Sequence, residues 1–328
     1  MNQSFQRRDV LRVVAAGAAV LCGAARAQSW PTKPVTMIVP FPAGGGTDAF
    51  ARPLSGQFTK ISGQTLVIDN RGGAGGTLGA SIAAKAPADG YTLFMGAVHH
   101  AIAPSVYPRL DYDIEKDFVP LMLLANVPQV VVINPKRVQA NTIQEFIALV
   151  KRNPGKFNYG SIGAGGVNHL ASAWFNSING LQMEHVAFKG LPPAVQELMA
   201  GRIDAMFAVT GGVAPFLESN KIKALAVSGR NRQPAAPNVP TFAEVGYPTF
   251  DASYYFGVVA PKGTPPEISA RFARDMSKII NTAEFKSKYL QPLGFEAVGD
   301  TPEQFAAFLK SDREVGAQKV KVSGAKLE

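Results

Sequence analysis

Three consecutive glycines, Gly44 to Gly46, stand between an apolar stretch and a helical pattern, and this arrangement suits the binding of an anion. The stretch VTMIV, residues 35–39, is short, apolar and β-branched, which indicates a buried strand. Thr47 or Asp48 could cap a helix that begins near Ala49, so the loop ends where backbone N–H groups lack a helical partner. Glycine lets a ligand approach that backbone closely, and the helix dipole favours negative charge.

Two other interpretations of this glycine loop stay open. The glycines could simply permit a tight turn between strand and helix. The pattern GxGxxA that begins at Gly44 also matches the dinucleotide-binding fingerprint, and Asp69 lies about 20 residues after it. Against a dinucleotide, Pro40 and Pro42 place a stiff extended segment where that fingerprint has a short turn.

Ser161 and His169 come nearest to the pattern of a hydrolytic site. Gly163 follows Ser161 at the spacing of a nucleophile elbow, but Tyr159 stands where the first glycine of that motif belongs. A hydrolytic triad requires a histidine beside an exposed serine, with an acid behind the histidine. His169 lies inside the first turns of a predicted helix, so we interpret it as a hydrogen-bonded packing residue. The pattern therefore favours a protein that is not an enzyme.

Metal and phosphate chemistry have little support in the sequence. His99 and His100 are adjacent, so their rings do not easily reach one metal ion together. The pair GK at 155–156 is followed by Phe157, where a phosphate-binding loop has serine or threonine. The chain has one cysteine, Cys22. We expect no metal and no cofactor.

The first 27 residues have the zones of a signal peptide. Arg7 and Arg8 precede a short apolar run, and an A-x-A cleavage site ends at Ala27. The twin arginines resemble a Tat signal, and a Sec signal has the same three zones. Cleavage after Ala27 would remove Cys22, so the mature chain would have no disulfide. We therefore predict an exported, periplasmic protein.

The charge of the chain indicates a mild attraction for anions. The formal net charge is +9, and residues 1–27 contribute +3 of it, which leaves +6 on the predicted mature chain. Lysines and arginines are scattered with no run of four, so the pattern does not predict nucleic-acid binding.

Strand patterns alternate with helix patterns along the rest of the chain, which is typical of a parallel, doubly wound sheet. A polar loop is expected at 97–100, and the glycine-rich loop 71–76 is interpreted as structural. Strands are expected at 66–68, 91–96, 157–161, 183–188, 205–209 and 224–228. Helices are expected at 77–85, 142–152, 167–177, 194–200, 266–280, 283–289 and 302–319.

Two apolar stretches predict that the chain passes twice between two sheets. Residues 119–133 are too long for one strand and are broken by prolines, and the strand at 254–260 lies where the chain could return. The sequence therefore predicts an α/β fold of two lobes, with residues 28–126 plus 254–328 in lobe 1 and residues 127–253 in lobe 2.

Three loops of this fold are expected to face one cleft, because ligands bind outside the carboxyl ends of such strands. They are 42–48, 97–100 and 161–169, and the last has glycines ahead of a helix that Asn168 could cap. Helix N-termini from both lobes would then hold a carboxylate at each end of a ligand.

Motifs along nearly the whole chain from Trp30 resemble those of one family. They include WPTKPVTMIVPFPAGGGTD, NRGGAGG, ADGYTLFMG, YDIEKDF, NPGKFNYGS, AFKGLPPAVQELMAGRIDAMF, NVPTFAEVG and GDTPEQFAAFL. The chain resembles the periplasmic solute-binding proteins of tripartite tricarboxylate transporters, often called Bug proteins. The resemblance implies a type II-like, Venus-flytrap fold in which two hinge strands join the lobes and the lobes close on a carboxylated ligand.

The resemblance also implies the ligand-binding residues. In lobe 1 they are Pro42, Ala43, Gly44, Gly46, Thr47, Asp48, Val98 and His99. In lobe 2 they are Ser161, Gly163, Gly165, Gly166 and Val167, followed by Phe188 and Ala208, and Tyr254 lies at the returning strand. The implied partners are a small carboxylate and, transiently, membrane transporter subunits, and we expect a monomer.

Several residues depart from the family pattern toward a less polar site. Ile162, Gly166 and Val167 replace hydroxyl residues. Phe188 replaces the tyrosine of the YKG motif, and Ala208 stands where an aspartate could pair with an amino group. With aromatic surface from Tyr254-Tyr255, these residues favour an aromatic mono- or dicarboxylate such as terephthalate.

The alternatives to an aromatic ligand are kept open. They are a binder of aliphatic dicarboxylates, a sensor component and, from another class, an exported hydrolase or dinucleotide-binding enzyme. Ile162, Phe188 and Tyr255 could also be core packing without contact to a ligand.

Overall fold

The computed structural model describes residues 30–44, 46–107 and 109–323 of the 328-residue chain. The predicted signal peptide at 1–27 lies outside these ranges. From Lys33 onward the chain forms one compact unit. Within the described ranges, no helix combines the length and the apolar character that a membrane crossing requires.

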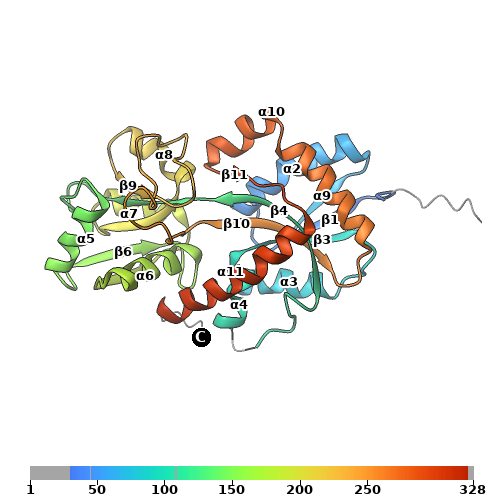
Figure 1. Cartoon of the computed structure of the whole chain (residues 1–328), viewed down its shortest axis with the longest axis horizontal. Helices are drawn as coiled ribbons and strands as arrows, with labels where there is room; N and C mark the ends of the chain where they lie inside the picture. The colour runs from blue at the N-terminus through green and yellow to red at the C-terminus, as the bar shows by residue number, and fades with distance from the viewer. Residues whose placement is uncertain (1–29, 45, 108, 324–328) are drawn as a thin grey trace, which may run out of the picture. The chain divides into compact units, whose positions relative to one another are not determined.

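Two β-sheets organise the chain, and Figure 1 shows them with their helices. The first sheet has the strand order β11-β4-β10-β3-β1-β2, and the second has the order β7-β6-β8-β5-β9. The strands of the first sheet are β1 (Val35–Val39), β2 (Leu66–Asn70), β3 (Thr92–Ala97), β4 (Phe118–Val127), β10 (Tyr254–Pro261) and β11 (Glu296–Ala297). Those of the second are β5 (Gln129–Ile133), β6 (Phe157–Ser161), β7 (Met183–Ala187), β8 (Ala205–Val209) and β9 (Lys223–Val227). The predicted α/β fold of two lobes is confirmed, and we call the first sheet with its helices lobe 1 and the second lobe 2.

Helices cover both sheets and differ from the predicted ones at several ends. In lobe 1 they are α2 (Gly46–Ser62), α3 (Thr77–Ala84), α4 (Val98–Val106), α9 (Pro266–Ile280), α10 (Ala283–Phe285) and α11 (Pro302–Ser323), with the short turns η1 (Ala74–Gly76), η2 (Lys286–Leu290) and η3 (Gln291–Leu293). In lobe 2 they are α5 (Ile143–Arg152), α6 (Val167–Asn179), α7 (Leu191–Met199) and α8 (Thr210–Glu218).

Two predictions about where helices begin are wrong, and one helix was not predicted. The expected loop 97–100 is largely the beginning of α4, and α8 was not predicted at all. α2 begins at Gly46, so Thr47 and Asp48 lie in its first turn and do not cap it. Asp48 does not cap α2, because its carboxylate accepts hydrogen bonds from the Gly44 N–H and from Arg52 Nε.

Strand direction explains how the chain moves between the sheets. β1 pairs parallel with β2 and β3, and β6 pairs parallel with β7 and β8, so each lobe has a parallel core. β10 is antiparallel to β3 and β4, and β5 is antiparallel to β8 and β9. Pro128 alone separates β4 from β5, so the chain passes directly from the first sheet to the second, and β10 brings it back.

A buried polar network ties the two passages together at Gln129. Its backbone N–H donates to Ser228 Oγ at 2.8 Å, and its Nε2 donates to the carbonyl of Ala252 at 2.5 Å. Asn168 is 2% exposed, and its Nδ2 donates to Gln129 Oε1 at 2.6 Å. Asn168 therefore does not cap its helix, contrary to the prediction. Because the network joins β5, the end of β9, the start of β10 and α6, it fixes where the chain changes sheets.

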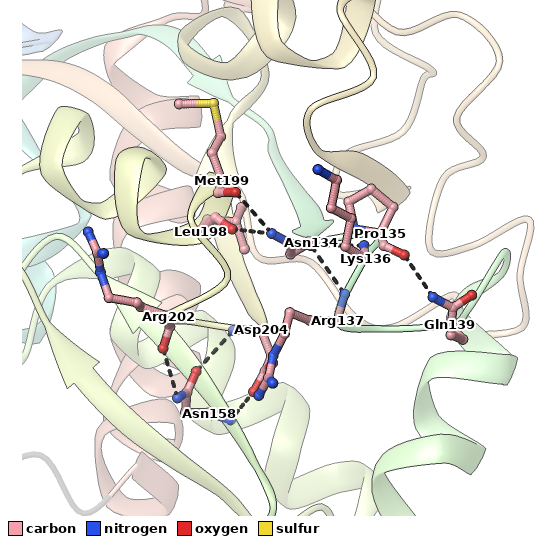
Figure 2. A network of polar contacts seen from close by, with 10 residues as sticks. All are labelled: Asn134, Pro135, Lys136, Arg137, Gln139, Asn158, Leu198, Met199, Arg202 and Asp204. Carbon is pink, nitrogen blue, oxygen red and sulfur yellow. Dashed lines mark hydrogen bonds and ion pairs between the residues drawn. The ribbon is translucent and has the colours of Figure 1, made fainter.

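The far end of the second sheet is held by a separate network, drawn in Figure 2. Asp204, which precedes β8 and is 1% exposed, accepts hydrogen bonds from Asn158 N–H at 3.0 Å and from Arg137 Nε at 3.3 Å. Asn158 Oδ1 accepts from Asp204 N–H at 2.9 Å, and Asn134 Nδ2 donates to the carbonyl of Leu198 at 2.7 Å. These bonds fix the amino ends of β6 and β8, and therefore the register that places their carboxyl ends.

Candidate ligand-binding site

The first predicted loop lies between β1 and α2, and one carboxylate holds its backbone. Asp48 is 2% exposed, and its Oδ2 accepts hydrogen bonds from the N–H of Gly44 at 2.8 Å and from Arg52 Nε at 2.7 Å. Asn70 Nδ2 donates to Oδ1 at 3.0 Å. Asp48 therefore folds the glycine loop back over the start of α2.

The surroundings of Asp48 keep it ionised. Burial opposes ionisation, but hydrogen bonds from Arg52, Gly44 and Asn70 outweigh it, so the pKa of Asp48 lies below its ordinary value of 3.8. The carboxylate is satisfied within the protein and serves as a support. The N–H groups that a ligand could use are those of the first turn of α2, which have no intrahelical acceptor.

Pro42, Ala43 and Gly44 are exposed, and so is Gly46 at the first position of α2. A further loop, which the sequence indicated to be only structural, borders them: a Cβ added to Gly72 would lie 3.1 Å from Pro42 Cδ. The exposed backbone at Gly72 is thus next to the candidate site. The paired glycines that follow β2 were the sequence signal for this contact.

The second predicted loop lies between β6 and α6, and two of its N–H groups are bonded inside the protein. Gly163 N–H donates to Ser161 Oγ at 3.2 Å, and Gly165 N–H donates to His169 Nδ1 at 3.0 Å. Gly166 is the N-cap of α6, and no side chain caps this helix. The first N–H groups of α6 therefore remain the natural donors for an anion at this end of lobe 2.

Two histidines support this loop from behind, and the sequence did not predict their pairing. The rings of His169 and His185 stack with centroids 3.8 Å apart and planes 8° apart. His185 Nε2 lies 2.7 Å from Ser161 Oγ, and the ring of Tyr159 lies 5.1 Å from that of His185. Burial and the charge of His185 lower the pKa of His169 to about 4, and burial lowers the pKa of His185. Both imidazoles are therefore neutral at pH 7.

Helices α4 and α6, which belong to different lobes, contact each other near β10. Ile102 of α4 packs in one hydrophobic cluster with Leu170 of α6, and Val167 and Tyr254 pack against that cluster. All four residues line a small cavity of about 20 Å³. Two predicted site residues, Val167 and Tyr254, are thus brought together, next to α4. The side chains of Val98 and His99 lie outside the described residues.

Other predicted site residues lie in the core. Ala208 is fully buried in a cluster with Val130 and Val213, and Phe188 is half-buried against the same cluster. Ser161 is also fully buried, and Thr47 is 7% exposed. In this conformation the side chains of Ala208 and Ser161 have no surface to offer a ligand, so their contribution is through packing and loop support.

Tyr255 is a core residue, and the expectation that it adds ligand-facing aromatic surface is wrong. It is 3% exposed and packs edge-on against Phe305 and Phe308 of α11. Tyr254 is half-buried and contacts Phe256 edge-on at 5.8 Å. Alternation along β10 puts the two tyrosines on opposite faces of the sheet, and Tyr255 belongs to the same hydrophobic cluster as Leu170 of α6. Ile162, by contrast, is 37% exposed at the second loop.

The helix starts at the two loops offer backbone N–H groups, which suit an anion. Ser161 and His185 are within hydrogen-bond distance, but the hydroxyl is buried and already contacts the carbonyl of Gly163 at 3.0 Å. Across the described ranges, no three His, Cys, Asp or Glu side chains gather closely enough to hold a metal ion. Each of the two loops leads into a helix that begins directly after glycines, α2 in lobe 1 and α6 in lobe 2.

A family model described as "Tripartite tricarboxylate transporter family receptor" matches residues 50–321. The protein BugT of Bordetella pertussis is 35% identical over 304 residues, which cover 92% of this chain and 93% of BugT. These matches extend through both lobes.

Solved structures with the same fold include proteins with bound carboxylates. Rpa4515 of R. palustris with adipate is 32% identical, with a TM-score of 0.79, and the match covers 91% of this chain and all of that one. The periplasmic binding protein BugD is 31% identical, with a TM-score of 0.76 and coverage of 91% and 100%. MatC of Rhodopseudomonas palustris with bound malate is 31% identical, with a TM-score of 0.75 and coverage of 89% and 100%.

Proposed function

This chain belongs to the tripartite tricarboxylate transporter receptor family and is a periplasmic solute-binding protein, and we propose that it captures a carboxylate between its two glycine loops. The observation that carries the proposal is the pair of helix starts, α2 and α6, which follow parallel strands at their carboxyl ends. Their first N–H groups and dipoles suit one carboxylate each. The bound adipate and malate of two relatives support this ligand class.

The binding residues of the proposal are assigned to three roles. The exposed loop Pro42-Ala43-Gly44 and the start of α2 contact one carboxylate, with Asp48 as support. The start of α6, with Gly163, Gly165 and Gly166 ahead of it, contacts the other end of the ligand. Val167 and Tyr254 line the space between, whereas Ser161, Phe188 and Ala208 shape it from the core. Val98 and His99 stay in the proposed site on the family resemblance alone.

Within this class, the ligand we propose is an aromatic mono- or dicarboxylate such as terephthalate. The support is the apolar character of the second loop, where Ile162 is 37% exposed, and the half-buried ring of Tyr254. A flat ring would bury apolar surface against both side chains. The burial of Tyr255 removes part of the aromatic surface that the sequence predicted.

The second candidate is an aliphatic dicarboxylate, and a specific observation favours it. The two relatives with named ligands hold adipate and malate, which are aliphatic. The apolar residue Ile162 would then contact the methylene chain of a ligand of adipate length.

The proposed mechanism is capture by closure without a chemical step. The chain crosses between the sheets at Pro128 and again ahead of β10. The proposed lobe boundaries, 28–126 plus 254–328 and 127–253, lie close to these crossings. A ligand that contacts both loops has a higher affinity for the closed form and shifts the population toward it. Membrane transporter subunits would recognise the closed form of a monomer that has been exported and cleaved after Ala27.

A thermal-shift screen of the chain from Gln28 onward tests the proposal. A ligand that binds only the folded state at 100 times its Kd stabilises it by about 2.7 kcal/mol. That stabilisation raises the Tm of a protein of this size by roughly 4–5 °C. The screen compares terephthalate and benzoate with adipate, succinate and malate.

The outcomes of the screen separate the candidates. A shift with terephthalate that exceeds the shift with adipate supports the aromatic ligand. A strong shift with adipate or malate and none with terephthalate contradicts it and leaves the aliphatic candidate. Failure of every carboxylate to shift the Tm contradicts carboxylate binding itself.

A further inference from the structure

His169 and His185 form a titratable pair directly behind the second loop. His185 on β7 is the register partner of Tyr159 on β6, so both side chains stand on the same face of the second sheet. His169 comes from the first turn of α6 and stacks on His185 with ring centroids 3.8 Å apart. Each imidazole contacts one part of the loop, because His169 Nδ1 accepts from Gly165 N–H and His185 Nε2 contacts Ser161 Oγ.

The hydrogen bonds allow His185 to take up a proton but oppose protonation of His169. Nδ1 of His169 accepts the Gly165 N–H, so a proton there would break that bond. A doubly protonated His185 would donate from Nε2 to Ser161 Oγ, and the Ser161 hydroxyl would donate to the Gly163 carbonyl at 3.0 Å. Ser161 Oγ would still accept the Gly163 N–H at 3.2 Å. The protonated arrangement therefore satisfies every contact of the loop.

The groups that face His185 supply no fixed charge. β6 and α6 pack against β7, and their titratable side chains are Tyr159 and His169. On β7 itself, Glu184 neighbours His185, is exposed and alternates to the opposite face of the strand. Stacking also makes the histidines oppose one another's protonation, so the pair accommodates one added proton.

We propose that His185 takes up a proton when a dicarboxylate binds and so supplies the positive charge that the ligand's second carboxylate requires. This inference rests on the proposed function, because the carboxylate must lie at the start of α6. A negative charge within a few ångströms favours the charged form of an imidazole. Lobe 2 would thus match the charge of its ligand with a proton acquired on binding, in place of a permanent lysine or arginine.

Linkage fixes the pH dependence of the affinity. Burial lowers the pKa of His185 in the free protein below its ordinary 6.5, and a bound anion raises it again. Between these two values, the complex holds a proton that the free protein lacks. The Kd therefore falls as the pH falls, by up to about tenfold per pH unit.

Isothermal titration calorimetry with adipate and with terephthalate tests the inference. Titrations at pH 6.5 in MES and in bis-Tris give the number of protons exchanged, because the two buffers differ in their heat of ionisation. We expect net uptake of up to one proton by the unmodified protein. His185→Gln keeps a partner for Ser161 and does not titrate, so uptake should disappear. Glu184→Gln is the matched control on the same strand and should leave uptake unchanged.

The histidine NMR signals give a second readout that needs no variant. Saturation with ligand should raise the pKa of His185 and leave that of His169 low. Saturable binding with no proton uptake and an unchanged His185 pKa would overturn the inference while leaving the proposed function intact. The absence of any binding would contradict the proposed function first.

Discussion

Asp48 shows at the residue scale how a charged side chain can shape a site without contacting the ligand. Its two carboxylate oxygens accept three hydrogen bonds, from Gly44, Arg52 and Asn70, and it is almost fully buried. The loop geometry that exposes the start of α2 depends on these bonds.

Replacing Asp48 by asparagine should therefore reduce both stability and binding. Both oxygens of Asp48 accept hydrogen bonds, and an asparagine has an NH2 group in place of one of them. At least one of the donors from Gly44, Arg52 and Asn70 would then lose its acceptor. We expect the free energy of unfolding to fall by about 1–3 kcal/mol. Urea unfolding and adipate calorimetry measure the two effects.

Asp69→Asn is the matched control for this prediction. Asp69 lies on β2 and forms an exposed ion pair with Arg71, with a distance of 2.9 Å between Nε and the carboxylate. Such pairs contribute about 0–1 kcal/mol. Equal losses in the two variants would contradict the supporting role of Asp48.

His169 gives the folded protein a sensitivity to acid. Its pKa is about 4 in the folded protein, against 6.5 for an unperturbed histidine, so the unfolded chain binds a proton that the folded chain does not. The neutral His169 therefore contributes to the free energy of unfolding in full above pH 6.5, and this contribution is lost as the pH falls from 6.5 toward 4.

His169→Gln isolates this contribution, because the Gln side-chain carbonyl can still accept the Gly165 N–H and does not titrate. We expect a smaller loss of unfolding free energy between pH 7 and pH 4.5 in the variant than in the unmodified protein. Urea unfolding at several pH values without ligand measures both. Parallel curves for the two proteins would show that His169 does not titrate as described.

At the scale of elements, the start of α6 is the clearest anion site. Gly166, its N-cap, has an extended backbone (φ −72°, ψ 162°) that other residues adopt without strain. Gly166→Asp would cap the helix and also place a negative charge where the ligand carboxylate is proposed to bind. Affinity for adipate or terephthalate should fall at least tenfold by calorimetry.

Gly166→Asn separates charge from shape. Either side chain brings a Cβ 3.2 Å from the Gly163 carbonyl, and both residues cap helices well. The asparagine variant should keep its affinity within about threefold, since the two variants differ mainly by one unit of charge near the helix start. Similar affinities for the aspartate and asparagine variants would place the anion elsewhere.

The network at the far end of the second sheet should affect stability alone. Asp204→Ala removes the acceptor for Asn158 N–H and Arg137, and we expect the free energy of unfolding to fall by about 1–3 kcal/mol. Ligand affinity should stay unchanged at a temperature where the variant is folded. Arg202→Ala, which breaks only an ion pair with Glu197 at the surface, should cost less than about 1 kcal/mol. A loss of affinity in Asp204→Ala would show that this network also controls the site.

The elements that the sequence predicted well are those with strong local patterns. The strands 157–161 and 205–209 and the helix 266–280 have the predicted bounds, since apolar periodicity and flanking turn residues agree there. The start of α4 and all of α8 were missed because His99-His100 and Gly211-Gly212 are typical of loops, and packing between elements overrides that preference.

Features of the site that depend on tertiary contacts could not be predicted locally. The sequence does not show that Tyr255 turns toward α11 while Tyr254 turns away. Nor does it show that His185 stacks on His169, since the register of β6 and β7 and the docking of α6 bring them together. The ligand-contact residues and the lobe boundaries stay predictions. The Asp48 and Gly166 variants and a crystal structure with bound ligand test them.

At the scale of the whole molecule, the proposed capture of a ligand requires both lobes. The buried bonds of Gln129 fix the crossing points, and Lys319 near the end of α11 reaches the ring of Trp174 on α6, with Nζ 4.6 Å from the ring centroid. In the proposed mechanism, the lobes would close about these crossings. A ligand that contacts one lobe only has no reason to favour the closed form.

A crystal structure of the chain from Gln28 onward, grown with terephthalate or adipate, tests the central claim most directly. We predict carboxylate oxygens about 2.7–3.2 Å from backbone nitrogens at the starts of both α2 and α6, with the ligand unaltered. A ligand bound to one lobe alone, or at a site away from both glycine loops, would contradict the account.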